Sequence, residues 1–221
     1  MRRTTAFFAE LGGRVLCSAA VVDDEWSPPI KLSPSQWDHL LAALPLVDAV
    51  AAEHGVVHAL HPHWGTLVER AGAVDRVLDG SDVGICLDTG HLALGGADAL
   101  RIAREYPRRV VHVHLKDVSD AVAQRLRAGE LDLVSAVQAG LFRPLGEGDA
   151  GVGEVVAALE ESGYAGWYVL EQDTALTDAA PSPGHGPADD VRRSVEFLAT
   201  LLQAKVGVVA TTEGRTNRPN V

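Results

Sequence analysis

The chain has 221 residues, of which 47% are hydrophobic and 22% are charged, as in an ordinary globular protein. Its formal net charge of −11 disfavours binding to nucleic acid, and no cluster of Lys and Arg offers a local exception. Cys17 and Cys86 lack the spacing of a metal-binding motif, and the apolar segment near the start is too short to span a membrane. We therefore expect a cytoplasmic protein that binds neither nucleic acid nor a membrane.

Apolar segments alternate with helical segments along nearly the whole chain. The expected elements, in chain order, are a helix over 1–13, a strand over 14–21, a helix over 33–55, a strand over 56–63, a helix over 67–78, a strand over 83–89, a helix over 98–107, a strand over 109–117, a helical region that ends at 140, a short strand over 141–149, a helix over 152–166, a strand over 167–173 and a helix over 188–203. Residues 1–205 are expected to form a single domain, and the small, polar residues 206–221 predict a disordered tail.

This alternation predicts a parallel sheet that is covered by helices. No G-x-G-x-x-G motif follows the first expected strand, which argues against a dinucleotide-binding fold. Polar residues gather where the expected strands end, and a (β/α)8 TIM barrel keeps its chemistry at that face. The six expected strands, with about six βα units, are two fewer than such a barrel contains. We therefore expect a TIM barrel that lacks its first two strands.

The segment HPHWGTLVE follows the second expected strand, and alternation in that strand puts His61 and His63 on one face. The other expected strands also end in polar side chains. These are Asp88 and His91 after the third strand, His112, His114, Lys116 and Asp117 in the fourth, and Glu171 and Asp173 in the last. Imidazole and carboxylate ligands together favour Mn²⁺, Co²⁺, Zn²⁺ or Fe²⁺ over Mg²⁺ or Ca²⁺.

Several of these residues also have a structural explanation when they are taken alone. Asp88, followed by Thr-Gly, is typical of a helix cap, and Asp98 is expected to cap the helix over 98–107. His112 is interpreted first as a hydrogen-bonded histidine of the barrel core. Capping does not explain three or four such strand ends in one chain, and their coincidence favours a shared site.

Five segments together carry a resemblance to a known family. They are HPHWGTLVE, GICLDTGHLALGGADAL, RVVHVHLKDV, FRPLGEGDAGV and GYAGWYVLEQD. They resemble the xylose-isomerase-like barrel superfamily, and within it the inosose dehydratases of inositol catabolism, from about residue 14 to about residue 200. The resemblance implies one divalent metal ion, Mn²⁺ or Co²⁺ before Zn²⁺ or Fe²⁺, held by Asp88, His114 and Glu171. Related isomerases have a glutamate as the first ligand, and the resemblance gives that place to His63, with His61 and Glu69 in support.

The resemblance implies a dehydratase of a keto-inositol, with a small polyol or keto-sugar as substrate. Glu171 is then the expected base that removes the proton next to the ketone, and His91 or His61 is the expected acid for the departing hydroxyl. Lys116 is expected to orient a substrate oxygen. The residues expected to bind substrate or to support the ligands are Glu69, His112, Asp117 and Glu147.

Other functions remain open at this point. A sugar isomerase or epimerase of the same superfamily shares the metal and differs in how the proton is moved. A nuclease that acts on abasic DNA needs further metal ligands and a basic groove, which the charge of −11 disfavours. A barrel without its first strands exposes sheet edges, so a non-catalytic remnant or a homo-oligomer is a further alternative.

Overall fold

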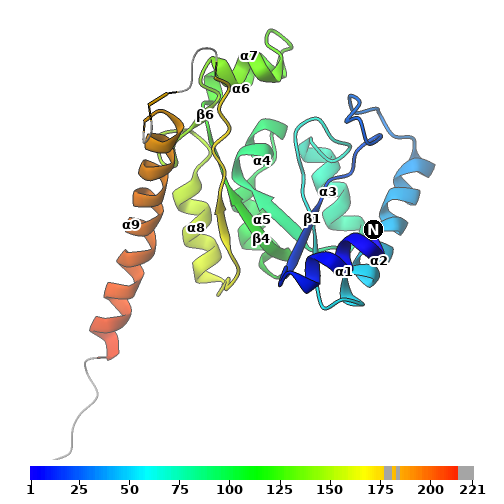
Figure 1. Cartoon of the computed structure of the whole chain (residues 1–221), viewed down its shortest axis with the longest axis horizontal. Helices are drawn as coiled ribbons and strands as arrows, with labels where there is room; N and C mark the ends of the chain where they lie inside the picture. The colour runs from blue at the N-terminus through cyan, green and yellow to red at the C-terminus, as the bar shows by residue number, and fades with distance from the viewer. Residues whose placement is uncertain (177–180, 183–184, 214–221) are drawn as a thin grey trace, which may run out of the picture.

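A curled parallel sheet with helices on its outer side forms the centre of the computed structural model, which describes residues 1–176, 181–182 and 185–213, with side chains up to Leu202 (Figure 1). Its strand order is β1-β2-β3-β4-β7. These strands are β1 (Val15–Ser18), β2 (Val57–Leu60), β3 (Ile85–Asp88), β4 (Val110–Leu115) and β7 (Tyr168–Leu170). The helices are α1 (Arg2–Glu10), α2 (Pro34–Ala52), α3 (Ala71–Gly80), α4 (Thr89–Gly95), α5 (Ala99–Glu105), the 3₁₀ turn η1 (Pro107–Arg109), α6 (Asp120–Arg127), α7 (Leu133–Gln138), α8 (Val152–Glu161) and α9 (Pro187–Glu213).

The sheet confirms the expected fold of a TIM barrel in part, since five of the six expected strands pair in parallel. The sixth expectation, a barrel strand over 141–149, was wrong. That segment holds β6 (Phe142–Arg143), which pairs antiparallel with β5 (Asp117–Val118) in a separate two-stranded sheet. Pro144 has no N–H for a ladder, and the Asp117 carboxylate accepts the N–H groups of Gly146, Gly148 and Ala150. This segment therefore folds as a loop around one aspartate.

Two helices differ from the expectation near the ends of strands. The helix expected over 67–78 begins only at Ala71, because Thr66 donates to the carbonyl of His63 and Glu69 accepts the N–H of Gly65, which closes a turn there. The short helix α4 was not expected, although its N-cap Asp88 accepts the N–H of His91 as a cap does. The expected N-cap at Asp98 is confirmed, since its carboxylate accepts the Arg101 N–H.

The last helix, α9, lies beside α8 and extends away from the sheet (Figure 1). Its backbone continues to Glu213, beyond the end expected at 203. The disordered tail expected over 206–221 stays a prediction, because residues 214–221 lie outside the described residues. In the described part of the chain, no helix is long and apolar enough to cross a membrane.

Alternation along the strands separates a hydrophobic outer face from a polar inner face. Ile85 and Leu87 of β3 are fully buried in the core that the sheet forms with the helices, whereas Cys86 and Asp88 alternate with them and lie on the inner face. Burial of each such aliphatic side chain is worth about 1.5–3 kcal/mol, so this core holds the strand ends in place.

A buried polar chain ties α2 to the first two strands. The ring of His58 is 0% exposed, and it lies 2.6 Å from Ser18 Oγ through Nε2 and 2.6 Å from Asp48 Oδ1 through Nδ1. Both ring nitrogens are therefore occupied, as a buried imidazole requires. This histidine belongs to the scaffold and not to the inner face.

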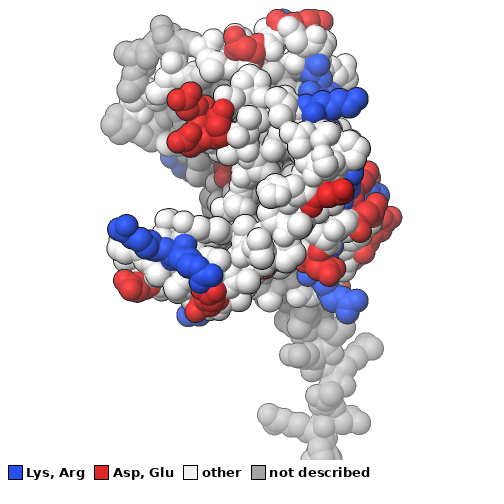
Figure 2. Space-filling model, turned by 90° about the vertical axis from the view of Figure 1, so that its right-hand side faces the viewer, with Lys and Arg blue, Asp and Glu red and all other residues white. Residues whose placement is uncertain are grey.

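Acidic and basic side chains are interspersed on the face shown in Figure 2, with no continuous basic surface across its described residues. Such a face offers a phosphate backbone little electrostatic attraction. The expectation that the protein does not bind nucleic acid remains a prediction.

Candidate metal centre

Four polar side chains meet where the parallel strands end. They are His61 after β2, Asp88 at the end of β3, His114 in β4 and Glu171 after β7. His114 Nδ1 lies 3.0 Å from Glu171 Oε1 and 3.8 Å from Asp88 Oδ2, and His61 Nε2 lies 3.4 Å from Asp88 Oδ2. The register puts Asp88 opposite His114, so the sheet itself brings these two together.

The geometry of Asp88, His114 and Glu171 fits a divalent cation. One ligand atom from each lies within 4.8 Å of the others. The buried Nδ1 of His114 lies between the carboxylates of Glu171 and Asp88, at 3.0 Å and 3.8 Å. A cation between these oxygens would take the place of the proton on that nitrogen. One imidazole and two carboxylates form a donor set for Mn²⁺, Co²⁺, Zn²⁺ or Fe²⁺.

His61 and His63 occupy different places, although the sequence suggested that they share a face. His61 is buried and forms a metal-ligand group with Asp88 and His91. His63 Nδ1 lies 2.7 Å from the carbonyl oxygen of Trp64, and its ring stacks on that of His91 with centroids 3.6 Å apart. Among the described residues, His63 belongs to no such group, so the geometry favours His61 as the neighbour of the carboxylates.

Lys116 is a buried cation at the edge of the cluster. Its side chain is only 2% exposed, and Nζ lies 2.9 Å from Glu171 Oε2 and 2.8 Å from Asp173 Oδ2. His91 Nε2 is 3.1 Å from the same nitrogen. Gly90 makes this position possible, since a Cβ there would meet the Lys116 side chain at 2.7 Å.

The carboxylates of the cluster are held in their charged form. Burial opposes ionisation of Asp88, but the hydrogen bond from His61 and the nearby cations keep its pKa below the usual range. Burial likewise opposes ionisation of Glu171, and its contacts with His114 and Lys116 bring its pKa far below the usual range. Both groups are therefore anionic at neutral pH.

The basic groups of the cluster divide into two kinds. Burial lowers the pKa of His91 to about 3, so its imidazole is neutral at neutral pH. Burial also disfavours the charged form of His114, but contacts with Cys17 and Glu171 prevail and raise its pKa to about 9. For Lys116, the charge of Asp88 and contacts with the neighbouring acids outweigh burial and raise its pKa. Without a metal ion, His114 and Lys116 balance the two carboxylates.

Four residues expected to bind substrate or support the ligands have varied positions. Glu69 accepts the N–H of Gly65 and pairs with Arg70, so it builds the turn after β2. Asp117 organises the 146–150 loop as described above. His112 lies on the inner face beside His114 with ring centroids 5.2 Å apart, and burial lowers its pKa.

The remaining one, Glu147, pairs with Arg193 of α9 and is not brought to the cluster. The interpretation of His112 as a hydrogen-bonded core histidine also finds no support. Its buried Nδ1 has no hydrogen-bond partner among the described residues.

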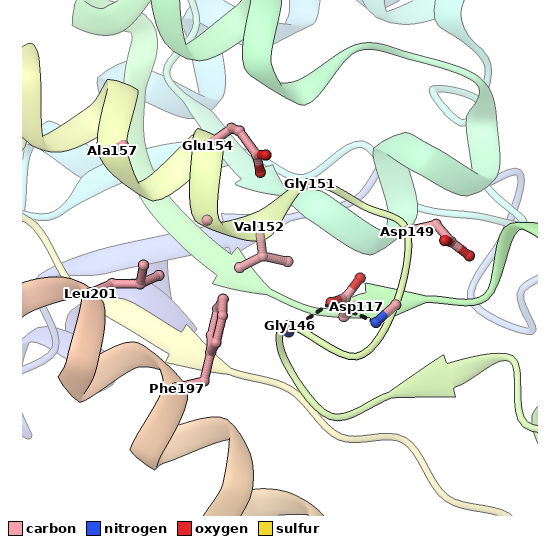
Figure 3. Close-up of a pocket in the computed structure, with 11 residues that line it drawn as sticks. Asp117, Gly146, Asp149, Gly151, Val152, Glu154, Ala157, Phe197 and Leu201 are labelled. Atoms are coloured by element: carbon pink, nitrogen blue, oxygen red, sulfur yellow. Dashed lines mark hydrogen bonds between the residues drawn. The ribbon is translucent and has the colours of Figure 1, made fainter.

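A pocket of about 370 Å³ opens beside the cluster. It is lined by His63, His91, Leu133, Val134, Val137, Phe142, Gln172, Asp173, Thr174 and Ala175. This lining combines polar and apolar side chains, which suits a small molecule with hydroxyls and carbon faces. A larger pocket of about 590 Å³ lies between the 146–153 loop and α9, where the Asp117 carboxylate is already occupied by backbone N–H groups (Figure 3).

Sequence reasoning missed two residues near the site. Trp26 packs edge-on against His63 with centroids 5.4 Å apart, and its φ of 56° lies in the left-handed region; nothing in its sequence context indicated this. Cys17 of β1 lies close to His112 and His114. Alternation along β1 carried a signal for Cys17, because it faces the same side of the sheet as those histidines.

The curled parallel sheet, with polar side chains collected at the carboxyl ends of its strands, defines the chain as part of a TIM barrel. Residues 1–201 match the family described as xylose isomerase-like TIM barrel. The chain belongs to this family.

Curated relatives are similar over part of their length. An inosose dehydratase of Geobacillus thermodenitrificans (strain NG80-2) is 36% identical over 148 residues, which cover 65% of this chain and 50% of the relative. The rhizopine catabolism protein MocC of Rhizobium meliloti is 35% identical over 153 residues, which cover 68% of this chain and 47% of that protein. The chain spans about half the length of these curated relatives.

Solved structures share the fold at lower identity. The IolI protein, solved with a bound zinc atom, matches with a TM-score of 0.64 at 16% identity and covers 92% of this chain and 68% of its own. The probable 3-DHS dehydratase AsbF of Bacillus anthracis matches with a TM-score of 0.66 at 18% identity over 90% of this chain and 68% of its own. A D-tagatose 3-epimerase-like protein matches with a TM-score of 0.60 at 19% identity over 94% and 69%. At these identities the likeness shows the fold alone.

Proposed function

We propose that the chain acts as a metal-dependent dehydratase of a keto-inositol or a similar cyclic polyol ketone. The observation that carries this proposal is the convergence of Asp88, His114 and Glu171 from three strands, beside a buried ammonium group. The 36% identity to a protein named inosose dehydratase supports the substrate class. The pocket beside the cluster combines polar and apolar side chains, a suitable lining for a polyol ring.

Asp88, His114 and Glu171 would hold the ion, and we assign the fourth position to His61 in place of His63. His61 Nε2 is already 3.4 Å from an Asp88 oxygen, whereas His63 Nδ1 is bonded to a backbone carbonyl. When bound, Mn²⁺ or Co²⁺ supplies Lewis-acid polarisation of the substrate ketone. Zn²⁺ and Fe²⁺ fit the same donors.

The side chains supply the proton transfers. Glu171 is anionic at neutral pH and accepts the proton from the carbon next to the ketone. Lys116 is the ammonium group beside Glu171, at 2.9 Å, and we assign to it the donation of a proton to the hydroxyl that departs from the adjacent carbon as water. His91 is neutral and lies 3.1 Å from Lys116 Nζ. It therefore positions the lysine and is not itself the acid.

The test is turnover of 2-keto-myo-inositol by the full chain with added Mn²⁺ or Co²⁺. We expect a product lighter by one water, which the Asp88→Asn and Glu171→Gln variants do not form. Glu147→Gln is the matched control, because that carboxylate pairs with Arg193 away from the cluster. Isomerisation of a ketose without water loss would instead favour the sugar isomerase or epimerase. A metal-loaded chain that changes neither substrate would overturn both.

A further inference from the structure

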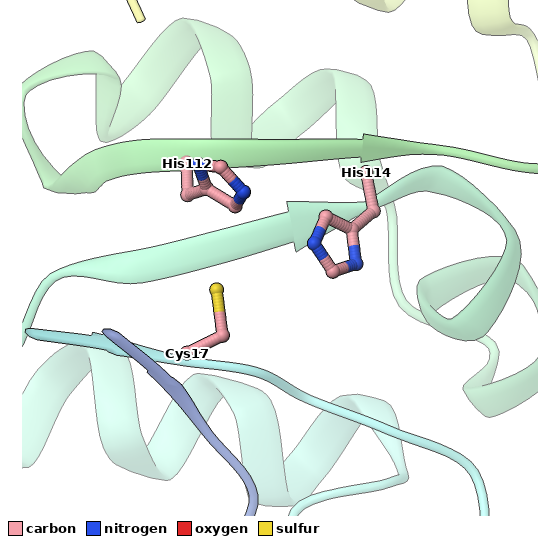
Figure 4. A group of neighbouring side chains, drawn as sticks. All are labelled: Cys17, His112 and His114. Carbon is pink, nitrogen blue, oxygen red and sulfur yellow. The ribbon is translucent and has the colours of Figure 1, made fainter. Parts of the chain in front are cut away.

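A second group of metal-ligating side chains lies on the inner face of the sheet. Cys17 of β1 points toward His112 and His114 of β4 (Figure 4). One ligand atom from each of the three lies within 4.8 Å of the other two. Cys17 is partly exposed, whereas Cys86 is buried. The first centre consists of His61, Asp88, His114 and Glu171. This second group shares only His114 with it.

Two nitrogen atoms in this group are available for an ion. His112 Nδ1 is buried and has no hydrogen-bond partner among the described residues. His114 contacts the carboxylates of Glu171 and Asp88 through Nδ1, and its other ring nitrogen faces Cys17 and His112 (Figure 4). The contact between Cys17 and His114 leaves the buried His112 nitrogen without a partner, and an ion held by the three residues would supply one.

We propose that Cys17, His112 and His114 form a second cation site that selects thiophilic ions, with Zn²⁺ as the expected occupant. A thiolate and two imidazoles are soft donors that bind Zn²⁺ well and Mg²⁺ or Mn²⁺ poorly. The first centre has oxygen donors in Asp88 and Glu171 and prefers harder ions. Three protein ligands leave a fourth tetrahedral position open to water.

The shared histidine makes the two sites antagonistic. An ion at the second site uses Nε2 of His114, and Nδ1 then keeps its proton and donates it to Glu171, 3.0 Å away. This carboxylate–histidine–zinc arrangement orients the ring and strengthens the metal bond. Because Nδ1 then carries a proton, His114 cannot coordinate an ion at the first centre. Zn²⁺ at Cys17 is therefore expected to displace Mn²⁺ held by Asp88 and Glu171.

The first experiment follows the thiol directly and does not depend on catalysis. The full chain is treated with a thiol-alkylating reagent, and modification of Cys17 is followed by mass spectrometry with Zn²⁺, with Mg²⁺ or with a chelator. We expect Zn²⁺ to slow alkylation of Cys17 by at least about tenfold and Mg²⁺ to leave it unchanged. The His112→Gln variant should lose this protection and still retain Mn²⁺ on dialysis. Mutation of a residue that only supports a metal ligand already weakens metal binding by about 10–100-fold, so loss of a direct ligand should remove the protection.

The second experiment uses Co²⁺ as a spectroscopic probe for sulfur ligation. A thiolate-to-cobalt charge-transfer band is expected for the unmodified chain and for Asp88→Asn, and its loss is expected for Cys17→Ala. Cys86→Ala removes the neighbouring buried thiol, which contacts Cys17 and groups with His61 and His114, and it should leave the band in place. A band that survives Cys17→Ala, or equal alkylation with and without Zn²⁺, would overturn the proposal. The dehydratase proposal is tested separately, by loss of water from the substrate and by the Asp88→Asn variant.

Discussion

Lys116 and Glu171 form an ion pair across neighbouring strands β4 and β7, with Nζ and Oε2 separated by 2.9 Å. The lysine side chain is 2% exposed and the glutamate side chain 28% exposed, so the pair is shielded from water on one side only. A charge in such a position is stable only with its partners in place. Lys116 and Glu171 therefore contribute to the stability of the sheet as well as to the proposed chemistry.

We predict that Lys116→Met lowers the free energy of unfolding by about 2–3 kcal/mol, because it removes the buried cation that Glu171 and Asp173 share. Arg125→Met is the control, since the Arg125–Glu130 pair is 52% and 60% exposed and should change stability by less than about 0.5 kcal/mol. Urea unfolding of the three proteins measures both effects. Equal losses in the two variants would contradict a special role for the buried lysine.

Metal retention should separate the two histidines after β2. We expect His61→Ala to lose bound Mn²⁺ on dialysis and His63→Ala to retain it, because only His61 approaches an Asp88 oxygen. Elemental analysis of each variant gives the answer. Loss of metal from His63→Ala alone would restore the ligand assignment implied by the family resemblance.

Metal binding should release protons. In the metal-free chain the pKa of His114 is raised to about 9, so this histidine is protonated at neutral pH and must give up its proton to a metal ion. Calorimetric titration with Mn²⁺ in two buffers of different ionisation enthalpy should show about one proton released at neutral pH. The release should diminish as the pH rises through about 9. His114→Gln is expected to remove it, and a release that does not depend on pH would argue against His114 as its source.

Gly95 of α4 packs closely against the backbone of the segment after β2, which carries His61 and His63. A Cβ at Gly95 would clash with the carbonyl oxygen of Glu69, and a backbone atom cannot easily give way. We predict that Gly95→Ala destabilises the protein by about 1–3 kcal/mol. Gly72→Ala in α3 is the control, because its Cβ meets nothing within 4 Å and should stabilise by about 0.4–1 kcal/mol. Thermal melts that move in the same direction for both variants would refute the close-contact explanation.

The sequence allowed the parallel fold to be predicted because periodicity reports burial. The runs that became β1, β2, β3, β4 and β7 are apolar and lie between helical segments, and all five pair as expected. The segment 141–149 has a similar apolar start but no place in that sheet. Its fold depends on three backbone N–H groups that find one buried carboxylate, Asp117, and this is a tertiary event without a local signal.

Part of the arrangement of the candidate site could likewise be expected from the sequence, and part could not. Asp88, His114 and Glu171 come together as expected, because strand register and alternation fix them. The roles of His61 and His63 could not be read from alternation, since β2 ends at Leu60 and the chain turns after it. The burial of Lys116 depends on the space left by Gly90 in α4, which no pattern in the sequence reveals.

The two oxygens of Asp88 have separate partners, since Oδ1 accepts the N–H of His91 at the start of α4 and Oδ2 faces His61 and His114. A descendant of this protein that lost its chemistry would therefore still keep this aspartate, because the helix needs its cap. The Glu171 side chain caps no helix, and its contacts among the described residues are with His114 and Lys116 of the cluster itself. In a search of related genomes for proteins that keep the proposed activity, Glu171 is thus the informative position. An intact LDTGH motif alone would overestimate the number of such proteins.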